Sequence, residues 1–128
     1  MEFEEKVVDG LGAVKVADEV VSIIAGVAAS EIEGIAGMSG GIVGGIADML
    51  GRKNLAKGVK VEVGETETSV NLYIIVKYGA KIPEVAISVQ ESVKNAIETM
   101  TGLKVVEVNV HVQGVAFPEP EEEEVHVN

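Results

Sequence analysis

Cysteine and tryptophan are absent from this chain of 128 residues, and aromatic residues make up only 3% of it. The lack of cysteine excludes disulfides, thiolate zinc sites and a cysteine nucleophile, and it agrees with a cytoplasmic location. No apolar run approaches the about 18 residues that a membrane helix needs, and the acidic N-terminus is unlike a secretion signal. We therefore expect a cytoplasmic protein with no direct membrane insertion.

Positive charge is also scarce, with 10 Lys and Arg against 21 Asp and Glu, which leaves a net charge of −11. A chain of this sign repels phosphate backbones, since non-specific binding to nucleic acid depends on cationic side chains. We expect no nucleic acid among its partners.

Catalytic and cofactor-binding motifs are missing as well. The glycine-rich stretch GMSGGIVGGIADMLGRKN, residues 37–54, invites comparison with a phosphate-binding loop. It fails that test because Ile46 and Ala47 stand where a P-loop has lysine and a hydroxyl residue, and no glycine triplet fits a dinucleotide fingerprint. Gly41 and Gly45, four residues apart, favour close packing of a helix instead. No serine or carboxylate pair matches a hydrolytic site, so we expect no enzyme, no cofactor and no metal.

The chain is long enough for one domain with a real core. Residues 1–9 and 118–128 are acidic, and we expect them to be solvated tails, the second one disordered beyond Pro118 and Pro120. The folded domain is predicted to span residues 10–117.

The apolar pattern predicts an α+β fold. A three-and-four spacing over residues 16–32 predicts a helix that stops by Gly34, and a weak alternation over residues 12–16 is compatible with a leading strand. Alternating valines predict a hairpin over residues 59–63 and 70–76. A second helix with Pro83 in its first turn and a buried stripe ending at Met100 follows.

The last strand, residues 104–113, is predicted to turn Val106, Val108, Val110 and Val112 inward and to place Asn109 and His111 outside. These elements give one mixed or antiparallel sheet, made of the hairpin and the C-terminal strand. Two to three helices are expected on one face of the sheet, and the other face is expected to be more polar.

One local cluster of positive charge stands out in this acidic chain. It consists of Arg52, Lys53, Lys57 and Lys60. These cations can simply follow the end of a short helix, where they favour the helix dipole and meet free carbonyls. The alternative is a docking point for an acidic partner or for the glutamate tail of another copy.

The histidines are too few for a recognisable site. His111 shares its strand face with Asn109, but neither a nucleophile nor further metal ligands stand at a suitable spacing. A surface strand residue is the ordinary interpretation, and a place on a contact surface is the functional one. We carry Asn109 and His111 as candidate partner-binding residues.

Four blocks in order carry a family resemblance: EVVSIIAGVAASEIEGIAGM, GRKNLAKGVKVEV, LYIIVKYGAKIPEVAISVQESVKNAIETMTGL and VVEVNVHVQGV. Together they resemble the alkaline shock protein 23 / general stress protein 24 family of Gram-positive bacteria, over residues 12–117. The resemblance implies a non-enzymatic cytoplasmic protein of the cell-envelope stress response, acting through protein–protein interaction. It also implies that some members are held at the membrane by a separate anchor protein.

Two functions remain open from the sequence. The first is an interaction or scaffold protein that docks to a membrane-anchoring protein, to itself as a homo-oligomer, or to both. The second is a regulator that binds a metabolic enzyme such as acetyl-CoA carboxylase, and so modulates fatty-acid synthesis, or that binds a small anionic metabolite. Short relatives with phrases such as GRKN and EVNVHVQGVAF suggest the second.

Overall fold

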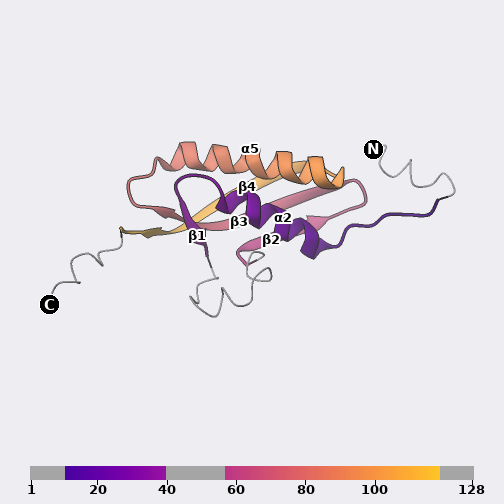
Figure 1. The fold of residues 1–128 in the computed structure, drawn as a ribbon, viewed down its shortest axis with the longest axis horizontal. Coiled ribbons are helices and arrows are strands. Elements are labelled where there is room, and N and C mark those ends of the chain that lie inside the picture. The colour runs from indigo at the N-terminus through magenta and orange to yellow at the C-terminus, as the bar shows by residue number, and fades with distance from the viewer. Residues whose placement is uncertain (1–10, 40–56, 119–128) are drawn as a thin grey trace.

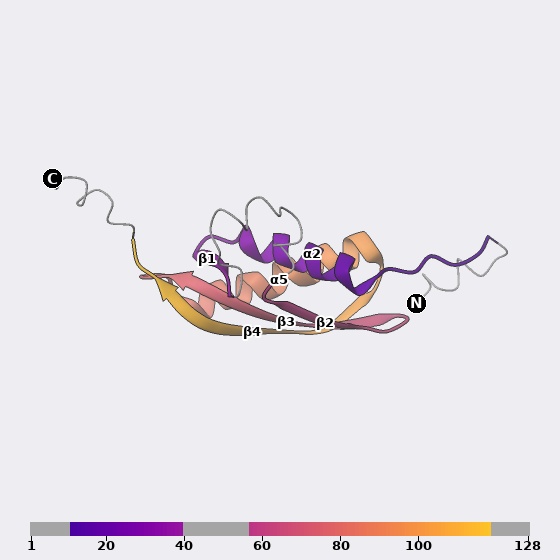
Figure 2. The ribbon, with the colours of Figure 1, turned by 90° about the horizontal axis from the view of Figure 1, so that it is seen from below.

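A computed structural model describes residues 11–39 and 57–118. In chain order the elements are α2 (Asp18–Ser30), β1 (Ile35–Met38), β2 (Val59–Val63), β3 (Glu67–Lys77), α5 (Ile82–Thr101) and β4 (Lys104–Ala116). The strands form one layer, and α2 and α5 lie side by side on one face of it (Figure 1, Figure 2). The predicted α+β domain with helices on one face of a single sheet is confirmed.

Strand β3 is the centre of the sheet. On one side it pairs in parallel with β4 over its whole length, from Glu67 opposite Lys104 to Lys77 opposite Ala116. On the other side it pairs antiparallel with β2 along its first half and with β1 along its second half. The sheet is therefore mixed, and α5 is the crossover between its two parallel strands.

Strands β1 and β2 meet end to end beside Tyr73. The Ser39 N–H donates to the Tyr73 carbonyl and the Tyr73 N–H donates to the Gly58 carbonyl, both at 2.8 Å. Gly58 has φ +78°, and a Cβ there would lie 2.7 Å from the Ser39 carbonyl oxygen. Only glycine combines this backbone conformation with so close an approach.

The core lies between the sheet and the helices. The inward residues of β3 are fully buried, as the alternation predicted: Val70, Leu72, Ile74 and Val76. They pack against one stripe of each helix, made of Val21, Ile24, Ala25, Ala28 and Ala29 in α2 and of Val85, Val89, Val93 and Ile97 in α5. Burying each large aliphatic side chain contributes about 1.5–3 kcal/mol, so this single layer of contacts holds the domain together.

Two expectations for the N-terminal part were wrong. Residues 12–16 form no strand, because their short alternation has no neighbouring strand to pair with in the described fold. Residues 35–38, for which no strand was predicted and of which the last two belong to the glycine-rich stretch, form β1. That strand is four residues long and contains Gly37, so it has no recognisable period. The first helix is confirmed, with Asp18 and Glu19 in its first turn.

The inward set predicted for the last strand was partly wrong. Val105 and Val108 are buried, whereas Val106 and Val112 are 49% and 36% exposed. Thr68 pairs with Val105 and Ser69 with Glu107, so Val106 is the extra residue of a β-bulge. A second bulge leaves Gln113 without a partner in β3. Each bulge shifts the alternation by one residue, which a strict period of two misses.

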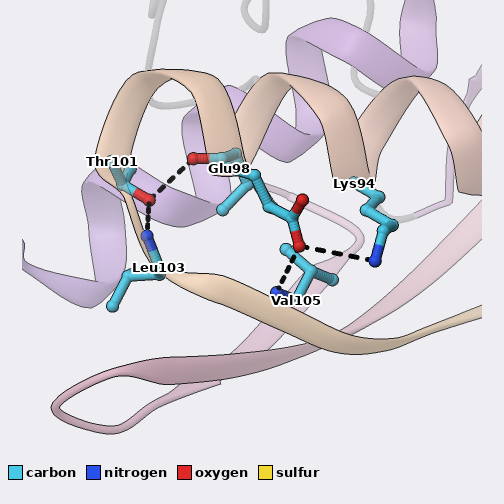
Figure 3. Close-up of polar contacts among 6 residues, drawn as sticks. Lys94, Glu98, Thr101, Leu103 and Val105 are labelled. Carbon is cyan, nitrogen blue, oxygen red and sulfur yellow. Dashed lines mark hydrogen bonds and ion pairs between the residues drawn. The ribbon is translucent and has the colours of Figure 1, made fainter. Parts of the chain in front are cut away.

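The end of α5 also differs from the predicted stripe. Met100 is 70% exposed, and Thr101 is buried in its place. The Thr101 hydroxyl donates to the Ile97 carbonyl at 2.7 Å and accepts from the Leu103 N–H at 3.0 Å (Figure 3). A polar residue therefore closes the turn from α5 into β4. Neither α2 nor α5 is long and apolar enough to cross a membrane.

Candidate functional site on the open face of the sheet

The face of the sheet opposite α2 and α5 is covered by no other element of the described structure (Figure 2). Because residues in register share a face, the pairing of β2, β3 and β4 decides which side chains lie there. Tyr73 is in register with His111, and Asn71 is in register with both Lys60 and Asn109. We call these five residues the open-face cluster.

An aromatic stack forms the centre of the open-face cluster. The Tyr73 and His111 rings lie 4.5 Å apart between centroids, with 10° between their planes. His111 Nε2 also lies 3.1 Å from Asn71 Oδ1, the geometry of a hydrogen bond from the imidazole N–H to the amide oxygen. The stack and the hydrogen bond together fix the orientation of the histidine ring, although His111 is exposed.

A cation completes the arrangement. Lys60 Nζ lies 6.0 Å from the centroid of the Tyr73 ring, which is the range of a cation–π contact. At an exposed site such a contact contributes about 0.5–1 kcal/mol. The Tyr73 ring therefore lies within reach of Lys60 and stacks on His111, so one tyrosine is the centre of the open-face cluster.

The chemistry of this arrangement suits recognition better than catalysis. His111 is oriented by an amide and not by a carboxylate, and the open-face cluster contains no serine, threonine or cysteine that the imidazole could activate. Within residues 11–39 and 57–118, no group of three or more His, Asp or Glu is placed to hold a metal ion. Tyrosine is enriched among the residues that dominate binding energy at interfaces, and here it is pre-ordered by its neighbours.

The predicted site residues divide into three groups. Lys60, Asn109 and His111 come together in the open-face cluster. Lys57 is exposed in the turn before β2, outside the cluster. Arg52 and Lys53 lie outside the described residues, as do Gly41 and Gly45, so helix packing by the glycine-rich stretch and the four-cation patch both stay predictions.

Sequence reasoning missed Asn71 and Tyr73. Both alternate with buried residues and so belong on the outer side of the hairpin, but neither was predicted as a candidate binding residue. A usable signal was present, since the chain has only two tyrosines and two phenylalanines. An aromatic residue on the polar side of a strand, in a chain so poor in aromatics, is a reason to suspect a contact surface.

The described structure also has a groove away from the open face of the sheet. It is a shallow open groove of about 600 Å³ between the turn that follows α2 and the first turn of α5. Its charged lining mixes both signs and consists of Glu31, Glu33, Lys77, Lys81 and Glu84. Such a lining selects no ligand charge, and none of its residues belongs to the open-face cluster.

Known proteins resemble this chain over most of its length. YqhY and YloU, two uncharacterized proteins of Bacillus subtilis (strain 168), are 41% and 39% identical to it over 107 and 111 residues. These alignments cover 84% and 85% of this chain and 79% and 92% of the relatives. A stress response regulator gls24 homolog of Streptococcus pyogenes is 33% identical over 108 residues, covering 84% of this chain and 60% of that protein.

A solved structure and a family model complete the comparison. MamM-CTD H285A superposes with a TM-score of 0.46 at 14% identity, covering 75% of this chain and 95% of that one, which is too distant to carry an argument. The model of the alkaline shock protein 23 family, described by its cell envelope-related function, matches residues 6–117. The chain therefore belongs to the alkaline shock protein 23 / general stress protein 24 family, as the four sequence blocks predicted.

Proposed function

We propose that this chain is a non-enzymatic, cytoplasmic scaffold of the cell-envelope stress response. In this proposal the open-face cluster binds a protein partner, and a membrane-anchoring protein that holds the chain at the membrane surface is the partner we favour. The family's cell envelope-related function and the stress response regulators among the relatives support the context.

One observation carries the proposal. An ordered group of Lys60, Asn71, Tyr73 and His111 lies on a sheet face that no described element covers. Pre-ordered side chains lose little conformational entropy when a partner binds them. The exposed stack and amides also leave hydrogen-bonding groups available to a partner, which is typical of a recognition surface.

Quantitative affinity purification tests the proposal. The tagged chain, Tyr73→Ala and the control Glu91→Ala are each captured from a membrane-containing lysate of the native host, and the co-purified proteins are measured by mass spectrometry. Glu91 is exposed on α5, in the layer opposite the open face. We expect an integral membrane protein that is retained by the parent and the control but lost by Tyr73→Ala.

The same experiment separates the competing function. If the proteins lost by Tyr73→Ala are subunits of acetyl-CoA carboxylase, the open face belongs to a metabolic regulator. If the parent and Tyr73→Ala retain the same proteins in equal amounts, the open-face cluster is not the docking surface and the proposal fails.

A further inference from the structure

Strand β4 has one free edge, and this edge is covered along the first half of the strand but not along the second half. Its pairing with β3 uses one side of the strand, and within residues 11–39 and 57–118 no strand pairs with the other side. An uncovered edge presents backbone donors and acceptors that can pair with another strand. Natural sheets cover such edges or place charged side chains on them, so a half of β4 that is neither covered nor charged is a candidate pairing surface.

The first half of β4 is covered by side chains of α5. Glu98 accepts a hydrogen bond from the Val105 N–H at 3.0 Å, and Gln90 donates to the Val108 carbonyl at 3.0 Å. Lys94 joins Glu98 at 3.4 Å, so one flank of α5 runs along this half of the strand (Figure 3). These contacts occupy the backbone groups that an incoming strand would need.

The second half of β4 has no such cover among the described residues. Backbone groups alternate sides along a strand, so Val110 and Val112 direct theirs to the same side as Val108. The C-terminal end of β4 also reaches past the helical layer (Figure 2). Val112 and Val115 are 36% and 46% exposed there. This half therefore offers free backbone groups beside apolar side chains.

The sequence of the second half lacks the charges and prolines that usually protect an edge, although it contains the bulge at Gln113. Residues 108–117 contain no Asp, Glu, Lys, Arg or Pro, in a chain whose net charge is −11. Charged side chains and prolines are the common means of blocking edge pairing, and both are absent where α5 stops covering the strand. At the end of this run Phe117 stacks on Tyr78 at 5.0 Å, and both rings are largely exposed.

We infer that the uncovered half of β4 pairs antiparallel with the same half of a second copy of this chain, with Val112 opposite its own counterpart and the bulge at Gln113 interrupting the regular ladder on either side of that pair. Two molecules with a charge of −11 repel each other over most of their surfaces, so contact is favoured where neither carries charge. A two-fold axis places the same uncharged run on both sides of the contact and brings Val112 and Val115 of both copies into it. The same residues of both copies therefore form the contact.

The inferred pairing has a consequence for the open face. Antiparallel edge pairing continues one sheet into the next, with the helices of both copies on one side and both open-face clusters on the other. If the proposed function holds, the dimer offers two docking surfaces to one membrane, and their combined avidity exceeds that of one. The pairing itself does not depend on the proposed function.

Sedimentation velocity of the full chain over a range of concentrations tests the inference. The variants are Val112→Lys, which places charges in the inferred contact, and the control Val106→Lys. Val106 is exposed on the same strand but in the half covered by α5. We expect a dimer for the parent and the control, and a dimer at least about tenfold weaker for Val112→Lys.

A cross-linking experiment makes the test independent of folding defects. The chain has no cysteine, so Val112→Cys and Val106→Cys each introduce a single thiol. Opposed residues of antiparallel strands approach closely enough for a disulfide. We expect oxidation to link Val112→Cys into dimers and to leave Val106→Cys largely monomeric.

Two results would overturn the inference: a parent chain that stays monomeric at every concentration, or Val112→Lys that associates like the parent. The outcome is separate from that of the capture assay. Tyr73→Ala leaves every residue of β4 unchanged, and Val112→Lys leaves the five residues of the open-face cluster unchanged, so either claim can fail alone.

Discussion

The two faces of β3 differ in what they contribute. Leu72 and Ile74 are fully buried under the helices, while Tyr73 between them turns to the open face and stacks on His111. The backbone is the same and only the alternation separates the two environments. The difference teaches that one strand supplies both stability, through its inner side chains, and a candidate recognition surface, through its outer ones.

The largest effect is expected on the inner face. Leu72→Ala removes a fully buried side chain at the centre of the core and leaves a cavity. We expect the free energy of unfolding to fall by about 2–5 kcal/mol. Urea denaturation measures the change, and Tyr73→Ala is the matched variant one residue away.

For Tyr73→Ala we expect a smaller loss, because its ring is partly exposed and its stack and cation–π contact are worth about 0.5–1.5 kcal/mol each at most. Equal losses for the two variants would contradict the division of labour between the faces.

A change at Gly58 is expected to disturb the junction where β1 and β2 meet beside Tyr73 of β3. Gly58→Ala forces a Cβ to within 2.7 Å of the Ser39 carbonyl oxygen in a left-handed conformation. We expect a loss of about 1–3 kcal/mol in the free energy of unfolding. Gly79→Ala is the control, since Gly79 has φ +96° but an added Cβ there meets nothing within 4 Å. Thermal unfolding that ranks Gly79→Ala as the more damaging variant would contradict the close approach at Tyr73.

Glu98 gives a smaller, pH-dependent effect at the edge of the sheet. The hydrogen bond from the Val105 N–H, followed by Lys94, lowers the pKa of Glu98 below its usual value. The folded state therefore binds fewer protons than the unfolded state as the pH falls toward this pKa. The stabilisation is complete above the unfolded pKa of about 4.3, and it is lost as the pH falls through the folded pKa.

Glu98→Gln should remove this dependence. At pH 7 we expect a loss below about 1 kcal/mol, because the side chain is one-third exposed and solvent screens it. The difference from the parent should shrink as the solution is acidified below the folded pKa. Urea denaturation at several pH values checks this, with Glu91→Gln on the same helix as control. A difference that grows on acidification would show that the sign is wrong.

Much of this fold could be predicted from periodicity. The stripes of α2 and α5 and the inner residues of β3 follow regular spacings, and a regular spacing is what a sequence displays. The bulges at Val106 and Gln113 could not be predicted, because a bulge depends on pairing with β3, which lies far away in the chain. Strand β1 could not be predicted either, because its four residues are stabilised by pairing with β3 and show no alternating pattern of their own.

The open-face cluster could be predicted only in part for a similar reason. Charge and side-chain type predicted Lys60, Asn109 and His111 as candidates. That they lie together around Tyr73 depends on the register of three strands. Register is decided by long-range pairing, so a single sequence shows which residues face outward but not which of them touch.

The most direct test of the central claim is the affinity of the purified partner for the chain and for Tyr73→Ala, measured by calorimetry with Glu91→Ala as control. The account predicts that Tyr73→Ala weakens binding at least about tenfold, a loss of about 1.4 kcal/mol, while the control binds like the parent. Equal affinity for all three proteins would contradict the claim that the open face of the sheet is where this protein docks.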